Sequence, residues 1–318
     1  MEKGLLSVII PCYNVEKTIS RQLDSILMQD YDNVEIFIVN DGSTDDSESI
    51  ILSYQNLFVQ KGYAFTYLLK ENGGLSSAIN HAFKFVNGEF LIWPDGDDCY
   101  TDASFFSKYV SVFLNDPLVT VVRSLPTYVL DSEIRRPFLV KEYKFDLFLE
   151  CMLGTDDFWY GAGLYMIRMS WYDQNTSERK IYSEKFNGQN IQLLLPTLYK
   201  GKCYTIVEYM YNIFILPNSH SRRKSVSYRE AIRRVKVHED SAIETLRSMN
   251  LSFGEYKFYN KNIQAYYFYK YAYIMLASLH FKDFFYRMST FTILKYMTFR
   301  KAYLLCASLF YGLFKKKQ

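Results

Sequence analysis

The sequence contains few of the residues that interrupt or cross-link a chain. Its 318 residues include 7 Pro and 14 Gly, so long flexible linkers are not expected. The 5 Cys are odd in number and widely spaced, without a Cys-x-x-Cys pair, which argues against a disulfide framework and a structural zinc site. Neither a Gly-x-Gly-x-x-Gly fingerprint nor a P-loop occurs, which argues against dinucleotide-binding and NTPase folds. The opening segment MEKGLLSVIIP lacks the apolar core of a signal peptide, and we expect it to be the first strand.

Composition and charge indicate a globular protein with two different faces. Hydrophobic residues make up 49% and charged residues 22%, which suits a packed core, and 18% are aromatic, which is unusually many. Residues 1–120 hold 17 acidic and 7 basic residues, whereas residues 121–318 hold 17 acidic and 30 basic residues. An acidic front and a basic, aromatic back favour a cation site joined to an anionic surface, and not a nucleic-acid partner.

Strands and helices alternate through the first third of the sequence. Short apolar runs predict strands, and apolar residues at helical spacing predict helices. Thr44 or Asp45 is the expected N-cap of the helix over 45–58. The expected strands are 5–10, 34–39, 63–69 and 90–93, and the expected helices are 16–28, 45–58 and 76–86. This order predicts an α/β fold with a doubly wound, mostly parallel sheet.

The remainder is mixed and then helical. We expect helices over 144–152 and 187–200, strands over 164–168 and 203–215, and a helical region from about 226 onward. No linker separates the first two parts. The predicted organisation is one domain over 1–220, with its parts at 1–120 and 121–220, followed by a helical C-terminal region over 221–318.

The C-terminal tail is basic and aromatic. Residues 281–318 contain 8 basic residues and 1 acidic residue. The longest uncharged stretches of the C-terminal third, 271–281 and 302–314, are shorter than the roughly 20 residues of a spanning helix. We therefore expect a helix that lies in the interface of an anionic membrane leaflet. The alternative is a helical cap whose aromatic side chains are core.

Polar residues follow three of the expected strands, at 11–14, 41–45 and 95–98. The carboxyl ends of parallel strands meet at one edge of the sheet, where ligands bind in open α/β folds. Tyr13 is suited to stack on a base, and Asp41 to accept hydrogen bonds from a uracil or a ribose. Asp95 and Asp97 repel each other unless a hard divalent cation lies between them, and such a cation often takes further ligands from phosphates. This pattern predicts a nucleoside diphosphate site.

Four segments together resemble the successive motifs of family-2 glycosyltransferases with the GT-A fold. They are SVIIPCYNVEKTI at 7–19, IVNDGSTDDS at 38–47, ENGGLSSAIN at 71–80 and LIWPDGDD at 91–98. The resemblance implies a nucleotide-sugar donor, commonly a UDP-sugar, a Mn²⁺ or Mg²⁺ ion, and inversion at the anomeric carbon. It also implies a glycan or polyprenyl-linked acceptor and work in capsule or other surface polysaccharide synthesis. We expect the donor to bind residues 1–120 and the acceptor to enter over residues 121–220. The widely spaced cysteines and the basic tail favour a cytoplasmic location on the inner membrane face. Carried over by position, the donor-binding residues are Pro11, Tyr13, Glu16, Asp41, Asn72 and Asp95, and the metal ligands are Asp95 and Asp97.

The sequence departs from the family at the general base. The family has an acidic residue near the start of a helix about 90 residues past the metal motif, and this position falls on Asn190. An amide does not accept a proton as a carboxylate does. Two explanations stay open: Asp156, Asp157 or Glu184 serves as the base, or the base has been lost. The second would make the chain a non-catalytic binding module or partner subunit.

Two further readings concern other charged residues. Arg222 and Arg223 are suited to close over a diphosphate, although a solvated basic run is the simpler interpretation. Asp95 and Asp97 also fit a phosphatase nucleophile pair, but the Asp41 and Asn72 motifs would then have no role.

Overall fold

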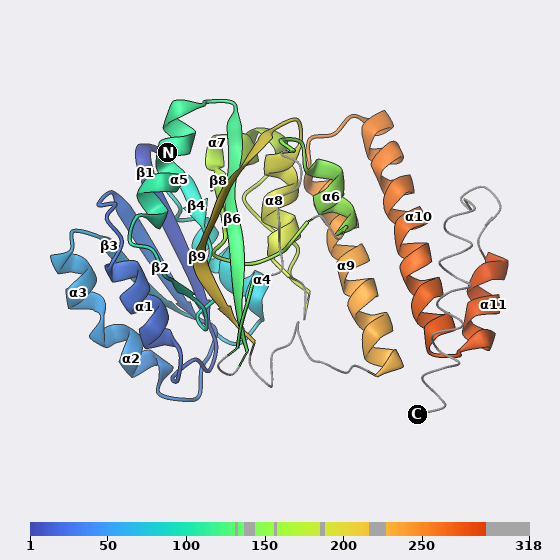
Figure 1. Ribbon diagram of the computed structural model, residues 1–318, viewed down its shortest axis with the longest axis horizontal. Helices are drawn as coiled ribbons and strands as arrows, with labels where there is room; N and C mark the ends of the chain where they lie inside the picture. Colours follow the sequence, from blue (N-terminus) through green and yellow to red (C-terminus); the bar gives the residue numbers. More distant parts are fainter. Residues whose placement is uncertain (131–132, 137–143, 156–157, 185–187, 216–226, 291–318) are drawn as a thin grey trace. The chain divides into compact units, whose positions relative to one another are not determined.

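The computed structural model describes the chain except residues 131–132, 137–143, 156–157, 185–187, 216–226 and 291–318 (Figure 1). The contacts divide the chain into two compact units. The first comprises Met1–Ser219 and Arg247–Asn250, and the second comprises His220–Leu246 and Leu251–Gln318.

The first part of unit 1 is the predicted alternation of strands and helices. Its elements are β1 (Glu2–Cys12), α1 (Ile19–Leu27), β2 (Val34–Asn40), α2 (Ser47–Ser53), α3 (Gln55–Gln60), β3 (Ala64–Leu69), α4 (Leu75–Phe83) and β4 (Gly88–Ile92). The four strands are parallel in the order β3-β2-β1-β4. Every residue of β2 is buried, as expected for a strand that is covered on both faces.

Strand β1 continues two residues beyond the expected end at Ile10. The carbonyl of Cys12 accepts from the N–H of Asp41 on the β2 side at 2.8 Å, so the backbone groups of Pro11 point to the opposite side. On the opposite side, strand β4 pairs with β1 only as far as Val8. Pro11 lies beyond this pairing, and the N–H that it lacks is not needed for a hydrogen bond to β4. Pro11 therefore lies inside the strand, buried, and not in the loop that follows it.

The single helix expected over 45–58 is wrong, because α2 and α3 are separate. At the break, the N–H of Tyr54 bonds to the carbonyl three residues earlier, and its hydroxyl bonds to Asp24 on α1 at 2.9 Å. The N-cap position lies one residue after the expected Asp45. Asp46 precedes α2 without a side-chain cap, and the carboxylate of Asp45 accepts from the N–H of Ser47 at 3.1 Å.

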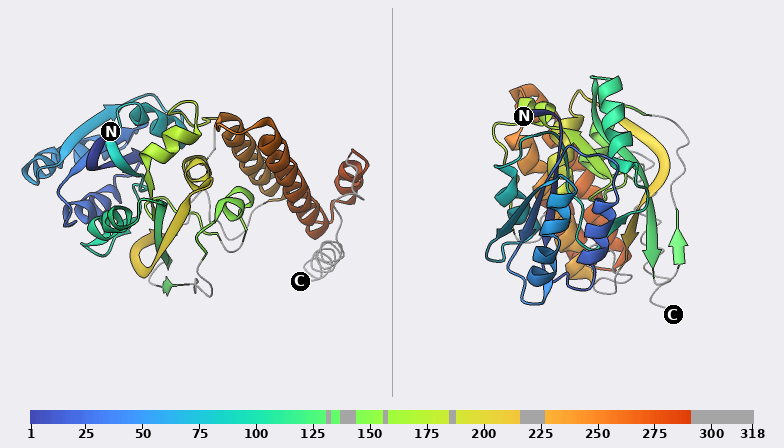
Figure 2. Two further views of the ribbon diagram at one scale, coloured as in Figure 1. Left: turned by 90° about the horizontal axis from the view of Figure 1, so that it is seen from above. Right: turned by 90° about the vertical axis from the view of Figure 1, so that its left-hand side faces the viewer.

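The second part of unit 1 completes a mixed sheet in the order β3-β2-β1-β4-β8-β6-β9-β5, with β7 paired to β6. Strand β8 is antiparallel to both β4 and β6, and β9 is parallel to β6. Helices lie on both faces of the sheet (Figure 2). The elements are β5 (Cys99–Tyr100), α5 (Phe105–Asn115), β6 (Val119–Leu130), β7 (Glu133–Arg135), α6 (Phe148–Leu153), β8 (Tyr165–Arg168), α7 (Met169–Asn175), α8 (Asn190–Leu198) and β9 (Lys202–Phe214).

The expected helix over 144–152 begins later, as α6, while the expected strands over 164–168 and 203–215 correspond to β8 and β9. Much of the aromatic content is core in this unit. Phe90 stacks on Phe113 with ring centroids 4.7 Å apart, and Phe105 stacks on Tyr109 at 4.0 Å. The α/β prediction is confirmed.

The described part of unit 2 is helical, as predicted for the C-terminal region. Its elements are α9 (Tyr228–Ser248, whose last two residues belong to unit 1), α10 (Phe253–Ala277) and α11 (Phe281–Thr290). Helix α10 begins with a capping box, in which Ser252 and Glu255 each accept from the other's backbone N–H. Among the described residues, no helix has both the length and the apolarity needed to cross a bilayer.

Candidate active site

The loop that follows β4 gathers three carboxylates. One oxygen from each of Asp95, Asp97 and Asp98 lies within 4.8 Å of the other two. Asp98 is buried, and its Oδ1 accepts from the N–H of Phe214 at the end of β9 at 2.9 Å. A set of hard oxygen ligands at this spacing fits Mn²⁺ or Mg²⁺, whose charge would offset the repulsion between the carboxylates. We call residues 95–98 the acidic loop.

The loops after β1 and β2 hold each other through reciprocal hydrogen bonds. The side-chain oxygen of Asn14 accepts from the N–H of Thr44 at 2.8 Å, and the backbone N–H of Asn14 donates to the Ser43 hydroxyl at 3.0 Å. Glu16 accepts through its carboxylate from the N–H of Asp46 at 3.2 Å. Tyr13, at the tip, is half exposed, which leaves its ring open to a ligand.

The acidic loop packs against the β1 loop. A Cβ on Gly96 would lie 3.6 Å from the Sγ of Cys12 and 3.5 Å from a methyl of Val15. Burial raises the pKa of the Cys12 thiol, and the charges of Asp95 and Asp97 raise it further. The first and fourth strand ends therefore meet at one edge of the sheet.

Asp41 lies at the same edge, where four hydrogen bonds organise the β3–α4 turn around it. Its carboxylate accepts from Lys70 Nζ at 2.5 Å, from the N–H of Gly73 at 3.0 and 3.2 Å, and from the N–H of Gly74 at 2.7 Å. Asn72 is exposed beside this turn. Lys70 was missed in the sequence, where it is an isolated base at the end of an apolar run.

Asn190, the residue expected at the family's base position, lies beside the acidic loop. The indole Nε1 of Trp93 donates to Asn190 Oδ1 at 2.8 Å, so the amide oxygen of Asn190 already has a partner. The neighbouring Gln189 is buried, and its amide Nε2 is 3.5 Å from Asp95 Oδ1. Both residues stand at the start of α8, where the motif spacing placed them.

Of the remaining candidate bases and diphosphate ligands, Glu184 lies among the described residues, and no described contact links it to this edge. Glu184 is exposed. Asp156, Asp157, Arg222 and Arg223 lie outside the described residues.

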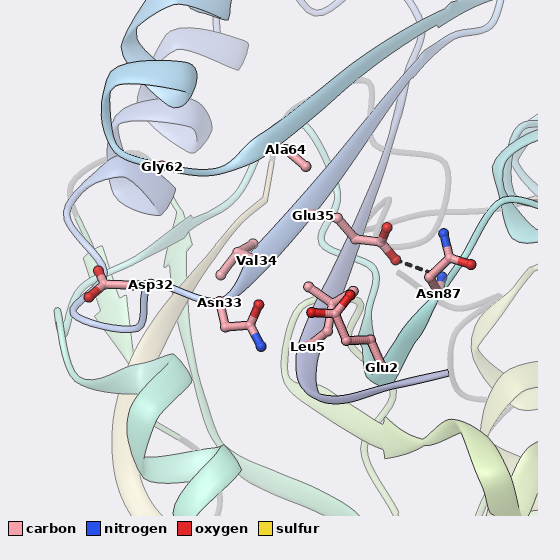
Figure 3. A pocket seen from close by; sticks show the side chains of 9 residues that line it. All are labelled: Glu2, Leu5, Asp32, Asn33, Val34, Glu35, Gly62, Ala64 and Asn87. Atoms are coloured by element: carbon pink, nitrogen blue, oxygen red, sulfur yellow. Dashed lines mark hydrogen bonds between the residues drawn. The ribbon is translucent and has the colours of Figure 1, made fainter.

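A separate hollow of about 290 Å³ lies at the amino-terminal end of the parallel strands (Figure 3). Within it, the Glu35 carboxylate accepts from the N–H of Asn87 at 2.7 Å. Ligands of open α/β sheets bind at the other end of the strands, so this hollow is not the candidate site.

Comparison with known proteins identifies the family of the chain. The model of the glycosyl transferase family 2 matches residues 7–174. An uncharacterized glycosyltransferase of Rickettsia typhi is 45% identical over 96 residues, which cover 30% of this chain and 28% of that protein. The minor teichoic acid biosynthesis protein GgaB of Bacillus subtilis is 36% identical over 101 residues, 31% of this chain and 11% of that protein. The matched region thus spans less than a third of the length of these relatives.

Two solved structures share the fold. S. aureus TarS 1-349 in complex with UDP-GlcNAc has a TM-score of 0.62 and 17% identity, over 86% of this chain and 80% of that chain. The mannosyltransferase PcManGT of Pyrobaculum calidifontis, in complex with GDP-Man and Mn²⁺, has a TM-score of 0.55 and 17% identity, over 98% of this chain and 87% of that chain. At this identity the likeness confirms the GT-A-like α/β fold alone. With a family model that matches more than half of its residues, the chain belongs to glycosyl transferase family 2.

Proposed function

We propose that this chain is a metal-dependent, inverting glycosyltransferase that takes a sugar from a nucleotide-sugar, a UDP-sugar by preference. The observation that carries the proposal is the convergence of three carboxylate oxygens within 4.8 Å at the end of β4, against the β1 loop. The donor assignment also draws on TarS, whose structure holds UDP-GlcNAc, and the metal on PcManGT, whose structure holds Mn²⁺.

Each strand-end residue has a proposed task. Asp97 and Asp95 hold the divalent cation, which when bound neutralises charge on the diphosphate leaving group. The exposed ring of Tyr13 stacks on the base of the nucleotide. Asp41 holds the uracil, while Asn72 lies near the donor. Pro11 shapes the floor of the nucleotide pocket from inside β1, and Glu16 keeps the β1 and β2 loops together.

In the proposed reaction, an acceptor oxygen attacks the anomeric carbon from the face opposite the diphosphate. The bond between that carbon and the leaving oxygen breaks, and its electron pair stays with the diphosphate. A hydroxyl acceptor also has to give up a proton. Asn190 does not take it, so the base is sought among Asp156, Asp157 and Glu184.

The amide side chain of Asn190 favours a second candidate function. A GT-A-like binding module or partner subunit would keep the nucleotide pocket and need no base. Release of free sugar from UDP-sugars, measured with Mn²⁺ and with EDTA, separates the two. Turnover that requires Mn²⁺ supports the enzyme, whereas thermal stabilisation by a UDP-sugar without turnover on any acceptor or on water supports the binding module.

The acceptor and the location are also proposals. GgaB is a teichoic acid biosynthesis protein, which supports a glycan or polyprenyl-linked acceptor in surface polysaccharide synthesis. On α11, the aromatic rings of Phe281, Phe285 and Tyr286 are exposed beside Lys282, at the start of the basic tail. We propose that this region lies on the inner membrane face.

Sedimentation with vesicles tests the membrane proposal. The full chain should bind vesicles that contain phosphatidylglycerol and not pure phosphatidylcholine vesicles, and deletion of residues 281–318 should abolish binding. Equal binding of the whole chain and of the chain without residues 281–318 would contradict the proposed interfacial helix.

A further inference from the structure

We propose that Arg21 is a positioning residue that sets the affinity of the acidic loop for its divalent cation, by holding the main chain of the loop against Phe214. The proposal rests on the metal dependence proposed above. Arg21 and Phe214 lie outside the four sequence motifs. Both act through contacts that only the fold creates.

Arg21 reaches the acidic loop from helix α1. Its guanidinium Nη2 donates to the backbone carbonyl of Asp97, across 76 positions of the sequence. The hydrogen bond fixes the main chain of the loop and does not use a carboxylate oxygen of Asp97. The side chain that is expected to bind the metal therefore projects from a backbone that Arg21 holds.

Phe214 supports this contact from strand β9. The guanidinium carbon of Arg21 lies 3.6 Å from the centroid of the Phe214 ring, a close cation–π stack. The backbone N–H of Phe214 donates to Asp98 Oδ1 at 2.9 Å. One residue of β9 thus orients both Arg21 and the third carboxylate, so the loop is held from two elements at once.

The guanidinium is committed to this position. Its Nε is buried and has no hydrogen-bond partner, which carries a desolvation cost in free energy. A guanidinium that acted only through its charge could stay solvated and avoid this cost. A flat, rigid guanidinium stacks on a ring and donates to a carbonyl at the same time, whereas the single ammonium of lysine does not do both in this geometry. Geometry and charge can therefore be separated by substitution.

The two roles predict opposite effects on metal binding. If Arg21 acts by position, both R21K and R21A weaken Mn²⁺ binding, because each releases the carbonyl of Asp97. If it acts by charge alone, R21A tightens binding, because a positive charge beside the cation is gone, and R21K changes nothing.

The test is a calorimetric titration of the metal-free, 318-residue chain with Mn²⁺. We expect R21K and R21A to raise the Kd for Mn²⁺ about tenfold, the effect of losing one charge-assisted hydrogen bond. F214L removes the ring and keeps the backbone donor to Asp98, and it should raise the Kd by a smaller factor, about threefold. The matched control is K17A, which removes an exposed positive charge near the start of the same helix and should leave the Kd unchanged.

A kinetic split completes the test. At saturating Mn²⁺, kcat of R21K should stay within about twofold of wild type while the Mn²⁺ concentration for half-maximal rate rises in step with the Kd. A general loss of structure would instead lower kcat and the melting temperature together. If R21A does not fold, R21K and F214L still decide the outcome.

Three results would overturn the inference. Wild-type affinity in R21K and F214L refutes positioning, and tighter binding in R21A assigns the effect to charge. Failure of the wild-type protein to bind Mn²⁺ at all refutes the proposed metal dependence, and the inference falls with it. The last result is distinguishable from the first two because it appears before any substitution is made.

Discussion

Replacement of Asp97 by asparagine should change the stability of the protein in opposite directions with and without metal. In the metal-free protein the three carboxylates of the acidic loop lie within 4.8 Å of one another. Two unit charges at that distance repel by about 1 kcal/mol in water and about 3.5 kcal/mol at an effective dielectric constant near 20. Because Asp97 is partly exposed, we expect D97N to stabilise the metal-free protein by about 1 kcal/mol, or about 2–4 °C in melting temperature.

Manganese should reverse this order. A ligand at 100 times its Kd stabilises the folded state by about 2.7 kcal/mol, which raises the melting temperature of wild type above that of D97N, since the variant has lost a ligand to the cation. The melting curves of the two proteins should therefore exchange places between EDTA and saturating Mn²⁺.

Scanning calorimetry in the two buffers measures both shifts. The matched control is D30N, which neutralises an exposed aspartate outside the acidic loop and should respond to Mn²⁺ as wild type does. A D97N protein that is less stable than wild type in EDTA, yet gains as much from Mn²⁺, would refute the reasoning about this cluster.

Two further predictions concern one buried carboxylate, Asp41, and one partly buried carboxylate, Glu239. Asp41→Ala should lower the free energy of unfolding by about 3–5 kcal/mol, because the Lys70 ammonium and two backbone N–H groups lose their acceptor in a buried site; a loss below about 1 kcal/mol in urea unfolding would contradict this. In unit 2, burial raises the pKa of Glu239, against the opposing hydrogen bond from Tyr271. The folded state then binds this proton more tightly than the unfolded chain, so unit 2 should lose stability as the pH rises from below about 4.5 through the raised pKa. Glu239→Gln should flatten that dependence in urea unfolding at successive pH values, and an unchanged slope would count against it.

The first half of the fold could be predicted because its signals are local. Strands β1 to β4 are short apolar runs, and each is followed by Gly, Asn or Asp residues that end it. Parallel strands bring their carboxyl ends to one edge, so the convergence of the Tyr13 and Asp97 loops also followed from strand order.

Strand β6 was not predicted, because some of its buried residues are polar. It carries the buried Arg123, Ser124 and Thr127, which break the hydrophobic run. The structure accommodates them with tertiary partners: Arg123 Nε donates to the Thr205 hydroxyl on β9 at 3.0 Å, and the guanidinium stacks 3.7 Å from the Trp159 ring. A pattern of residue types does not contain these partners, because they come from distant parts of the chain.

By itself, the sequence determined the alternation of parallel strands and helices in residues 1–120, the loops that meet at one edge of their sheet and the amide at position 190. Only the tertiary structure decided what those side chains hold: Asp41 around the turn before α4, Asn190 against Trp93, and Arg21 between Phe214 and the acidic loop. Periodicity and turn residues report the local path of the backbone and which face is buried. Hydrogen bonds between residues such as Trp93 and Asn190, 97 positions apart, depend on how whole elements pack, and that is fixed only when the sheet and its helices close together.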